Sequence, residues 1–120
     1  MIRGEILNIA TARVCARSQD YGEPEDNFAK IAEYWSIYLG EHVSALDVAH
    51  MMLLLKLARA DAVGSIDTYV DMAGYAACAG EIWHKYERMK ETVNTAWEDI
   101  KKEDAANHEW HDAVVDPHST

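Results

Sequence analysis

Helix-breaking residues are scarce in this chain, and their scarcity limits the fold more than any other feature of the sequence. Two prolines and six glycines are spread over 120 residues, and long stretches of Ala, Leu, Met, Glu and Lys lie between them. These residue types have high helix propensity. The sequence therefore predicts an all-α protein, a four- to five-helix bundle with a long C-terminal helix.

The turn residues predict where the helices begin and end. Gly22 and Gly40 suit helix ends, Pro24 suits a first helical position, and Ser44 with Asp47 forms a capping box. Four helices are predicted, at about residues 3–18, 25–39, 45–62 and from about 67 onward, the last capped by Ser65 or Asp67. The third is apolar nearly all round its middle, which predicts the central position in the bundle. The fourth continues toward the C-terminus as one long helix or as two with a kink.

The predicted organisation is one helical domain over residues 1–112 with a frayed tail at 113–120. Asp and Glu total 21 against 11 Lys and Arg, a net charge of −10, which disfavours binding to nucleic acid or to an anionic membrane. Two cysteines are too few for a disulfide framework, and no apolar run reaches the roughly 18 residues of a membrane span. Charged residues interrupt the N-terminal segment, so it lacks the unbroken apolar stretch of a signal peptide. We therefore expect a cytoplasmic protein.

The fourth predicted helix carries the most informative side chains. Asp67 and Asp71 lie one helical turn apart, and Gly74 follows near the same line. Carboxylates at this spacing suit Mg²⁺, and a glycine lets a ligand or another helix approach closely. The alternative is that Asp67 is only an acidic residue in the first turn, where the helix dipole favours it, and that Asp71 pairs with an arginine. The expected core face is the opposite one, with Tyr69, Val70, Ala73, Ala76 and Ala77.

Two cations, Lys56 and Arg59, stand late in the third predicted helix. Their three-residue spacing lets both reach one anion, so they are candidates for binding phosphate beside a metal held by Asp67 and Asp71. An inter-helix salt bridge to those aspartates explains the same pattern equally well. Asp47 is first a capping residue, and it is a metal-ligand candidate only where the fold brings its helix end close.

The segment at residues 20–28 is a glycine turn leading into a helix. Its acidic residues suit a metal, which makes Glu25 a further ligand candidate. Tyr21 or Phe28 can stack on a base, and Tyr21 and Asn27 are the substrate-binding candidates here. Turn chemistry and core packing also account for this segment without any ligand.

Three runs carry a resemblance to known proteins, DYGEPEDNFAKIAEYWSIYLG, DVAHMMLLLKLAR and DTYVDMAGYAA. They cover about residues 13–80 and resemble an uncharacterised all-α family encoded mainly by phages and prophages, in which the three motifs occur in the same order. That family distantly resembles the MazG-like nucleoside triphosphate pyrophosphohydrolases, in which acidic residues bind Mg²⁺. The resemblance implies a MazG-like fold, a nucleotide ligand and Mg²⁺ as cofactor. Asp71 matches the Asp of the Glu-x-x-Asp motif, but Asp67 is displaced by one position from its Glu, and the Glu-Glu-x-x-Glu run has no counterpart.

Three functions remain open from the sequence. The first is nucleotide binding with Mg²⁺-dependent hydrolysis of a nucleoside triphosphate to a monophosphate and pyrophosphate. The second is non-catalytic sequestration of a nucleotide, such as a host immune signal, and the third is an acidic surface that binds a basic host protein and so inhibits host defence. A contact stripe is also predicted at three tryptophans with regular spacing, Trp83, Trp97 and Trp110. They are more than the core of one small bundle needs, which predicts a homo-oligomer.

Overall fold

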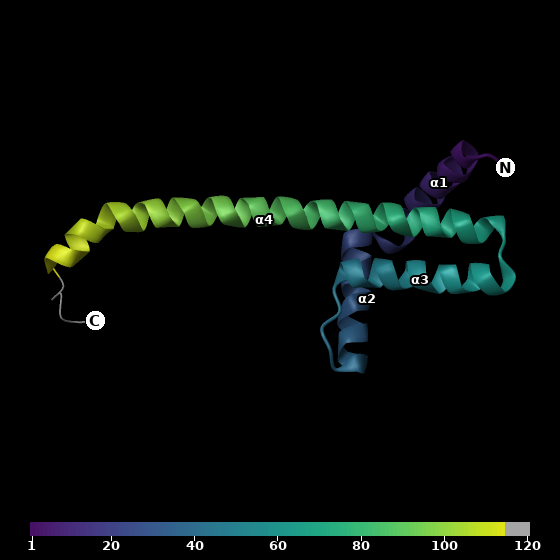
Figure 1. Cartoon of the computed structure of the whole chain (residues 1–120), viewed down its shortest axis with the longest axis horizontal. Helices are drawn as coiled ribbons and strands as arrows, with labels where there is room; N and C mark the ends of the chain where they lie inside the picture. The colour runs from purple at the N-terminus through teal and green to yellow at the C-terminus, as the bar shows by residue number, and fades with distance from the viewer. Residues whose placement is uncertain (115–120) are drawn as a thin grey trace. The chain divides into compact units, whose positions relative to one another are not determined.

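The computed structural model describes the backbone of residues 1–114 and the side chains of residues 1–106. Within this part of the chain there are four helices and no strand (Figure 1), so the all-α prediction is confirmed. The helices are α1 (Arg3–Tyr21), α2 (Pro24–Leu39), α3 (Ala45–Val63) and α4 (Ile66–Val114). Among these helices none is long and apolar enough to cross a membrane.

The chain divides into an N-terminal unit, Met1–His84, and a C-terminal unit, Lys85–Thr120. The predicted domain over residues 1–112 runs across this boundary and stays a prediction. The predicted frayed tail at 113–120 lies outside the described residues, except for the backbone of its first two positions. Of the two alternatives for the C-terminal segment, one long helix is confirmed, because α4 continues without a break to Val114.

The predicted helix-end signals are confirmed. Gly22 and Gly40 have positive φ angles of 84° and 68°, a conformation that costs glycine little. Pro24 is the first residue of α2. The Ser44 amide donates to Asp47 Oδ2 and the Asp47 amide donates to Ser44 Oγ, each at 3.0 Å, which completes the capping box.

One helix end differs from its predicted position, and the difference matters for the site. Helix α1 continues to Tyr21 rather than ending near residue 18, because the polar residues before Gly22 are compatible with a helix and the glycine is the first true break. The Gly22 amide donates to Ser18 O at 3.0 Å and closes the last turn. The extra turn places Tyr21 on the same face of α1 as Val14 and Ser18.

The core of the N-terminal unit lies where α2, α3 and α4 meet. Helices α3 and α4 run antiparallel on either side of the turn at Gly64 and Ser65 (Figure 1). The side chains of Val48, Val70 and Ile82 are fully buried. Small residues around them let the helices pack closely, among them Ala32, Ala49 and Ala79.

The prediction that the third helix is central is wrong for most of its length. Its first turns are buried at Ala45, Val48 and Ala49, but Leu54 is 65% exposed and Leu57 is 55% exposed. Helix α3 contacts α2 over its beginning and faces α4 along one side, and no other described element of the N-terminal unit covers its outer side. An apolar pattern all round the helix therefore does not mark a buried helix here.

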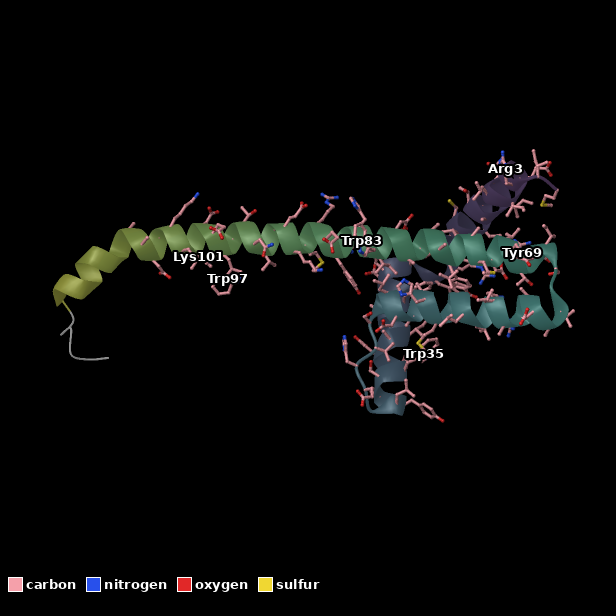
Figure 2. The ribbon with its side chains drawn as sticks, in the orientation of Figure 1. Arg3, Trp35, Tyr69, Trp83, Trp97 and Lys101 are labelled. Atoms are coloured by element: carbon pink, nitrogen blue, oxygen red, sulfur yellow. The ribbon has the colours of Figure 1, made fainter. Side chains whose placement is uncertain are left out.

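The expected core face of α4 is also wrong in part. Tyr69 is 52% exposed, and Figure 2 shows its side chain standing out from α4, whereas Gly74 and Cys78 are buried. Because Gly74 lacks a side chain, α1 packs closely at this point, and a Cβ at Gly74 would lie 3.4 Å from Val14 Cγ2. The close approach of a helix predicted at Gly74 is confirmed, and the stripe of small residues on α4 that includes Gly74 and Cys78 faces inward.

Candidate functional site

A cavity of about 350 Å³ lies in the N-terminal unit, and all four helices contribute to its wall. This volume falls within the roughly 300–1,000 Å³ of small-molecule pockets. Helix α1 supplies one face of residues at helical spacing, including Val14, Ser18 and Tyr21. The inward stripe of α4 supplies Gly74 and Cys78 to the opposite wall.

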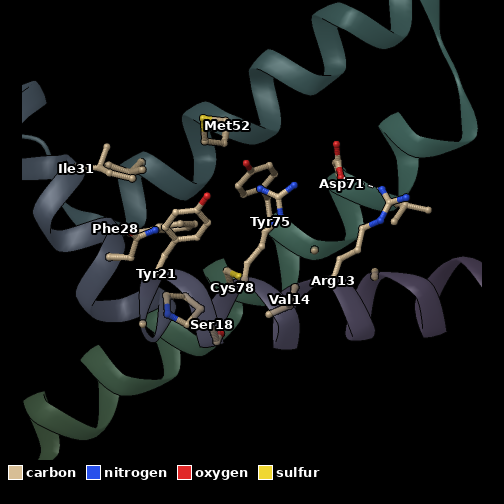
Figure 3. A pocket seen from close by; sticks show the side chains of 18 of the residues that line it. Arg13, Val14, Ser18, Tyr21, Phe28, Ile31, Met52, Asp71, Tyr75 and Cys78 are labelled. Carbon is tan, nitrogen blue, oxygen red and sulfur yellow. Dashed lines mark hydrogen bonds and ion pairs between the residues drawn. The ribbon is translucent and has the colours of Figure 1, made fainter.

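Aromatic side chains form much of the apolar wall. Phe28 and Tyr75 have ring centroids 6.2 Å apart and ring planes tilted by 33°, a favourable aromatic contact. Tyr21 and Met52 line the same cavity as these two rings (Figure 3). Tyr21 is 66% exposed although it lines the cavity, so its ring lies at the opening.

One side of the cavity is charged. Arg13 and Arg17 of α1 and Asp71 of α4 belong to the lining. Arg13 Nη1 donates to Asp71 Oδ1 at 3.4 Å (Figure 3). Arg13 Nη2 donates to Asp67 Oδ1 at 2.8 Å. Lys56 Nζ of α3 donates to Asp71 Oδ2 at 2.9 Å. Asp71 therefore connects three helices through two cations.

These contacts determine the charge state of the cluster. Burial alone would raise the pKa of Asp71, but the hydrogen bond from Lys56 and the charges of Lys56, Arg13 and Arg17 outweigh it, so the pKa is lowered. The Lys56 and Asp71 side chains are 15% and 20% exposed, whereas the Asp67 side chain is 67% exposed. At neutral pH the Lys56–Asp71 pair is thus an ionised and largely buried contact, and the Asp67 contact is a surface one.

Comparison with known proteins places this unit in a family. Residues 5–83, which include every residue that lines the cavity, match the model of a family described as a domain of unknown function, DUF6378. The chain belongs to the DUF6378 family. The predicted resemblance to a phage-encoded family is supported by two relatives, both phage proteins.

The two relatives are each called Gene 55 protein. The one from Mycobacterium phage D29 is 40% identical over 85 residues, which is 70% of this chain and 54% of that protein. The one from Mycobacterium phage L5 is 48% identical over 62 residues, which is 50% of this chain and 40% of that protein. This chain thus spans about half the length, or less, of the curated relatives it matches. No solved structure matches the chain, so the MazG-like fold stays a prediction.

The DUF6378 structure brings together some of the predicted site residues. Tyr21, Asn27 and Asp71 line the cavity as a group. Lys56 lies outside the lining but holds Asp71 in place, so the predicted alternative of an inter-helix salt bridge is confirmed for Lys56. Arg59 is exposed, does not line the cavity and has no ion pair among the described side chains.

The residues predicted as metal ligands do not form one site. Asp67 and Asp71 are paired with cations, which is the alternative predicted for Asp71. Asp47 is held in the capping box of α3, where the hydrogen bond from the Ser44 amide contributes most to its lowered pKa, and Glu25 does not line the cavity. Among the described residues no three His, Cys, Asp or Glu side chains are grouped closely enough to hold one metal ion. Magnesium binding stays a prediction, and the residues present do not fit it.

Among the cavity residues of the DUF6378 domain that were missed as site candidates in the sequence are two cations and two aromatic residues, namely Arg13, Arg17, Trp35 and Tyr75. A usable signal existed in α1, where Arg13 and Arg17 share a face with Tyr21 at intervals of four residues. Cys78 is buried in the wall of the cavity. Burial, with Glu81 and Glu25 nearby, raises the pKa of its thiol to about 11, so the thiol stays protonated and is a poor nucleophile.

Proposed function

We propose that the DUF6378 domain of this chain binds a nucleotide in the cavity between its four helices. The base occupies the aromatic part, and the phosphates lie at the cationic edge formed by α1. The observation that carries the proposal is that Tyr21, Phe28 and Tyr75 line the same cavity as Arg17. An aromatic pocket with a cationic edge has the two chemical features that recognise a flat base joined to an anion.

The base-binding part of the proposal rests on shape and polarity. Stacking between a base and an aromatic ring is worth about 1–3 kcal/mol in nucleic-acid complexes. Tyr21 is placed at the opening, where a base can cover its ring. Asn27 lines the same cavity, and its amide carries both a donor and an acceptor for the edge of a base.

The phosphate-binding part rests on Arg17. Asp71 already interacts with Lys56 and Arg13, whereas no ion pair of Arg17 is found among the described side chains. Arg17 is exposed at the cavity and bears a guanidinium that suits phosphate oxygens. The cavity lining carries two cations, Arg13 and Arg17, and one carboxylate, Asp71. In a chain with a net charge of −10, this local excess of positive charge favours an anion.

Calorimetric titration with the common ribonucleotides and deoxyribonucleotides, without Mg²⁺, tests the proposal. We expect saturable binding of at least one nucleotide at one site per chain. Tyr21→Ala is expected to weaken it at least tenfold, since about 1.4 kcal/mol of stacking is lost. Tyr34→Ala is the matched control, because Tyr34 is 64% exposed and Tyr21 is 66% exposed, but only Tyr21 lines the cavity. Equal effects of the two substitutions, or no binding of any nucleotide, contradict the proposal.

A second pair of variants tests where the phosphates bind. Arg17→Gln removes a cation that lines the cavity, and Arg59→Gln removes one that does not. The proposal predicts weaker binding of triphosphates to Arg17→Gln alone, with a reduced salt dependence of affinity. A larger effect at Arg59 would instead support the phosphate site predicted from the sequence.

The same titrations separate binding from catalysis. Because the Asp67 and Asp71 carboxylates are held by cations, we propose sequestration rather than hydrolysis, so the ligand should be recovered intact. Release of pyrophosphate after addition of Mg²⁺ would instead support the hydrolase prediction. The third prediction, an acidic surface that binds a basic host protein, requires salt-sensitive binding that Tyr21→Ala leaves unchanged.

A further inference from the structure

The C-terminal unit carries an apolar stripe that its own described residues leave uncovered. From Lys85 to Ala106 this unit is a single helix. Met89 is 56% exposed, Val93 is 51% exposed and Ile100 is 44% exposed. Figure 2 shows the side chain of Trp97, which is 56% exposed, extending from the ribbon of this segment. A lone helix in water gains nothing from such a stripe, since helical stability in proteins comes mainly from packing an apolar face.

The stripe has the spacing of a coiled coil. Intervals of three and four residues alternate along the positions Tyr86, Met89, Val93, Ala96 and Ile100. This spacing places the five side chains on one seam of the helix, in the a and d positions of a heptad repeat. The pattern ends at Glu103, the next d position, so the seam is about two and a half heptads long.

The charges beside the seam favour one orientation for a second copy of this chain. The flanking e and g positions carry Lys85 and Lys90 at the start of the seam and Asp99 and Asp104 at its end. In a parallel pair of helices, each g position faces the e position five residues further along the partner. Lys85 would then face Lys90, and Asp99 would face Asp104, so both ends would be repulsive.

An antiparallel pair removes this conflict. In such a pair e positions face e positions and g positions face g positions, so Lys90 faces Trp97, Thr92 faces Asp99, and the like-charge pairs disappear. The basic start of one seam also lies at the same level along the axis as the acidic end of the other, which is favourable at longer range. The antiparallel pair also places Met89 opposite Ile100 and Val93 opposite Ala96. Glu103, the polar residue that ends the seam, then lies opposite Tyr86, whose phenol group can donate a hydrogen bond to a carboxylate. We infer that residues 86–103 of α4 associate with the same segment of a second copy as a short antiparallel coiled coil. This inference is independent of nucleotide binding.

Sedimentation equilibrium of the full chain tests the association. We expect a concentration-dependent monomer–dimer equilibrium for the natural sequence and a monomer for Val93→Lys. Asn94→Lys is the matched control, because it introduces the same residue at the next position, off the seam, and should leave the dimer intact. Circular dichroism checks that both variants keep their helix content. A monomeric natural chain, or a dimer unaffected by Val93→Lys, overturns the inference.

Spin labels test the orientation. In a Cys15→Ser background, in which the remaining Cys78 is buried and should not be labelled in the folded chain, one cysteine replaces Arg88, Thr95 or Lys102. These three residues share one outward heptad position. An antiparallel pair centred near residue 95 places labels at 95 close together, and it separates labels at 88 or 102 by roughly 20 Å along the helix axis, at 1.5 Å per residue. Pulsed dipolar spectroscopy should therefore give one short and two long distances. Three similar distances indicate a parallel pair and overturn the proposed orientation.

Discussion

Replacing Asp71 with asparagine removes the carboxylate that joins α1, α3 and α4, and the effect on stability can be worked out from the structure. The carboxylate is 20% exposed and accepts a hydrogen bond from Lys56 Nζ at 2.9 Å. In Asp71→Asn the Lys56 ammonium, itself 15% exposed, remains largely buried without a counter-charge. Removing one partner of a buried pair is costly because the other charge is left uncompensated.

The expected loss for Asp71→Asn is about 2 kcal/mol in the free energy of unfolding, the range for a hydrogen bond to a charged group. For a unit of 84 residues this corresponds to a fall in Tm of roughly 8–16 °C. Asp67→Asn is the matched control, because the Asp67 side chain also contacts Arg13 but is 67% exposed. Exposed ion pairs contribute little, so Tm should fall by no more than a few degrees.

Thermal unfolding followed by circular dichroism measures both changes. A double-mutant cycle with Lys56→Met then isolates the pair, and we expect a coupling free energy between Lys56 and Asp71 of about 1–2 kcal/mol. Asp71→Asn and Asp67→Asn variants with the same Tm would show that burial does not strengthen this contact, and the reasoning would be wrong.

A carboxylate, two glycines and two cysteines of the N-terminal unit can be tested in the same way. The pKa of Asp71 is lowered in the folded protein. The stabilising effect of the Asp71 carboxylate is therefore complete above the unfolded pKa of about 4 and is lost as the pH falls below that value. The Tm difference between the natural chain and Asp71→Asn should shrink toward pH 3. Gly64→Ala should destabilise the fold, because the added Cβ would lie 2.8 Å from the backbone oxygen of Ala60, one turn earlier. Gly80→Ala should be neutral or stabilising by up to about 1 kcal/mol, because Gly80 is at an open position within a helix. A thiol reagent at pH 8 should modify exposed Cys15 quickly and buried Cys78 only upon unfolding.

Each of these predictions has a clear contrary outcome. A Tm difference for Asp71→Asn that is constant down to pH 3 would mean that the carboxylate titrates normally in the fold. Alanine substitutions at Gly64 and Gly80 with equal effects would contradict the close approach at Gly64. Two equally fast thiols would mean that the wall of the cavity opens readily at Cys78.

Local patterns in the sequence predicted the helix ends well, because the residues that end a helix act through their own backbone. Gly22, Gly40, Pro24 and the Ser44 capping box are at or near their predicted positions for that reason. The burial of each face could not be predicted in the same way. Which side of α4 is covered depends on α1, which packs against Gly74 from far away in the sequence.

The charged residues of the site illustrate the same limit. Asp71 and Lys56 were recognisable as partners because a short turn connects their helices. Arg13 lies 54 residues before Asp67, and no local pattern connects the two. Arg59 has the right charge and spacing but does not line the cavity, because the position of a side chain depends on how its helix is rotated in the fold.

The most direct test of nucleotide binding uses the single phenylalanine of the chain as a probe. Phe28 is 8% exposed and lines the cavity, so protein labelled with 4-fluorophenylalanine gives one ¹⁹F resonance from inside the proposed site. A nucleotide that enters the cavity should shift this resonance saturably, with the Kd found by calorimetry, and Tyr21→Ala should weaken the response. A nucleotide that binds by calorimetry and leaves the Phe28 resonance unmoved would contradict the proposed site, and a panel in which none binds would contradict the proposed function.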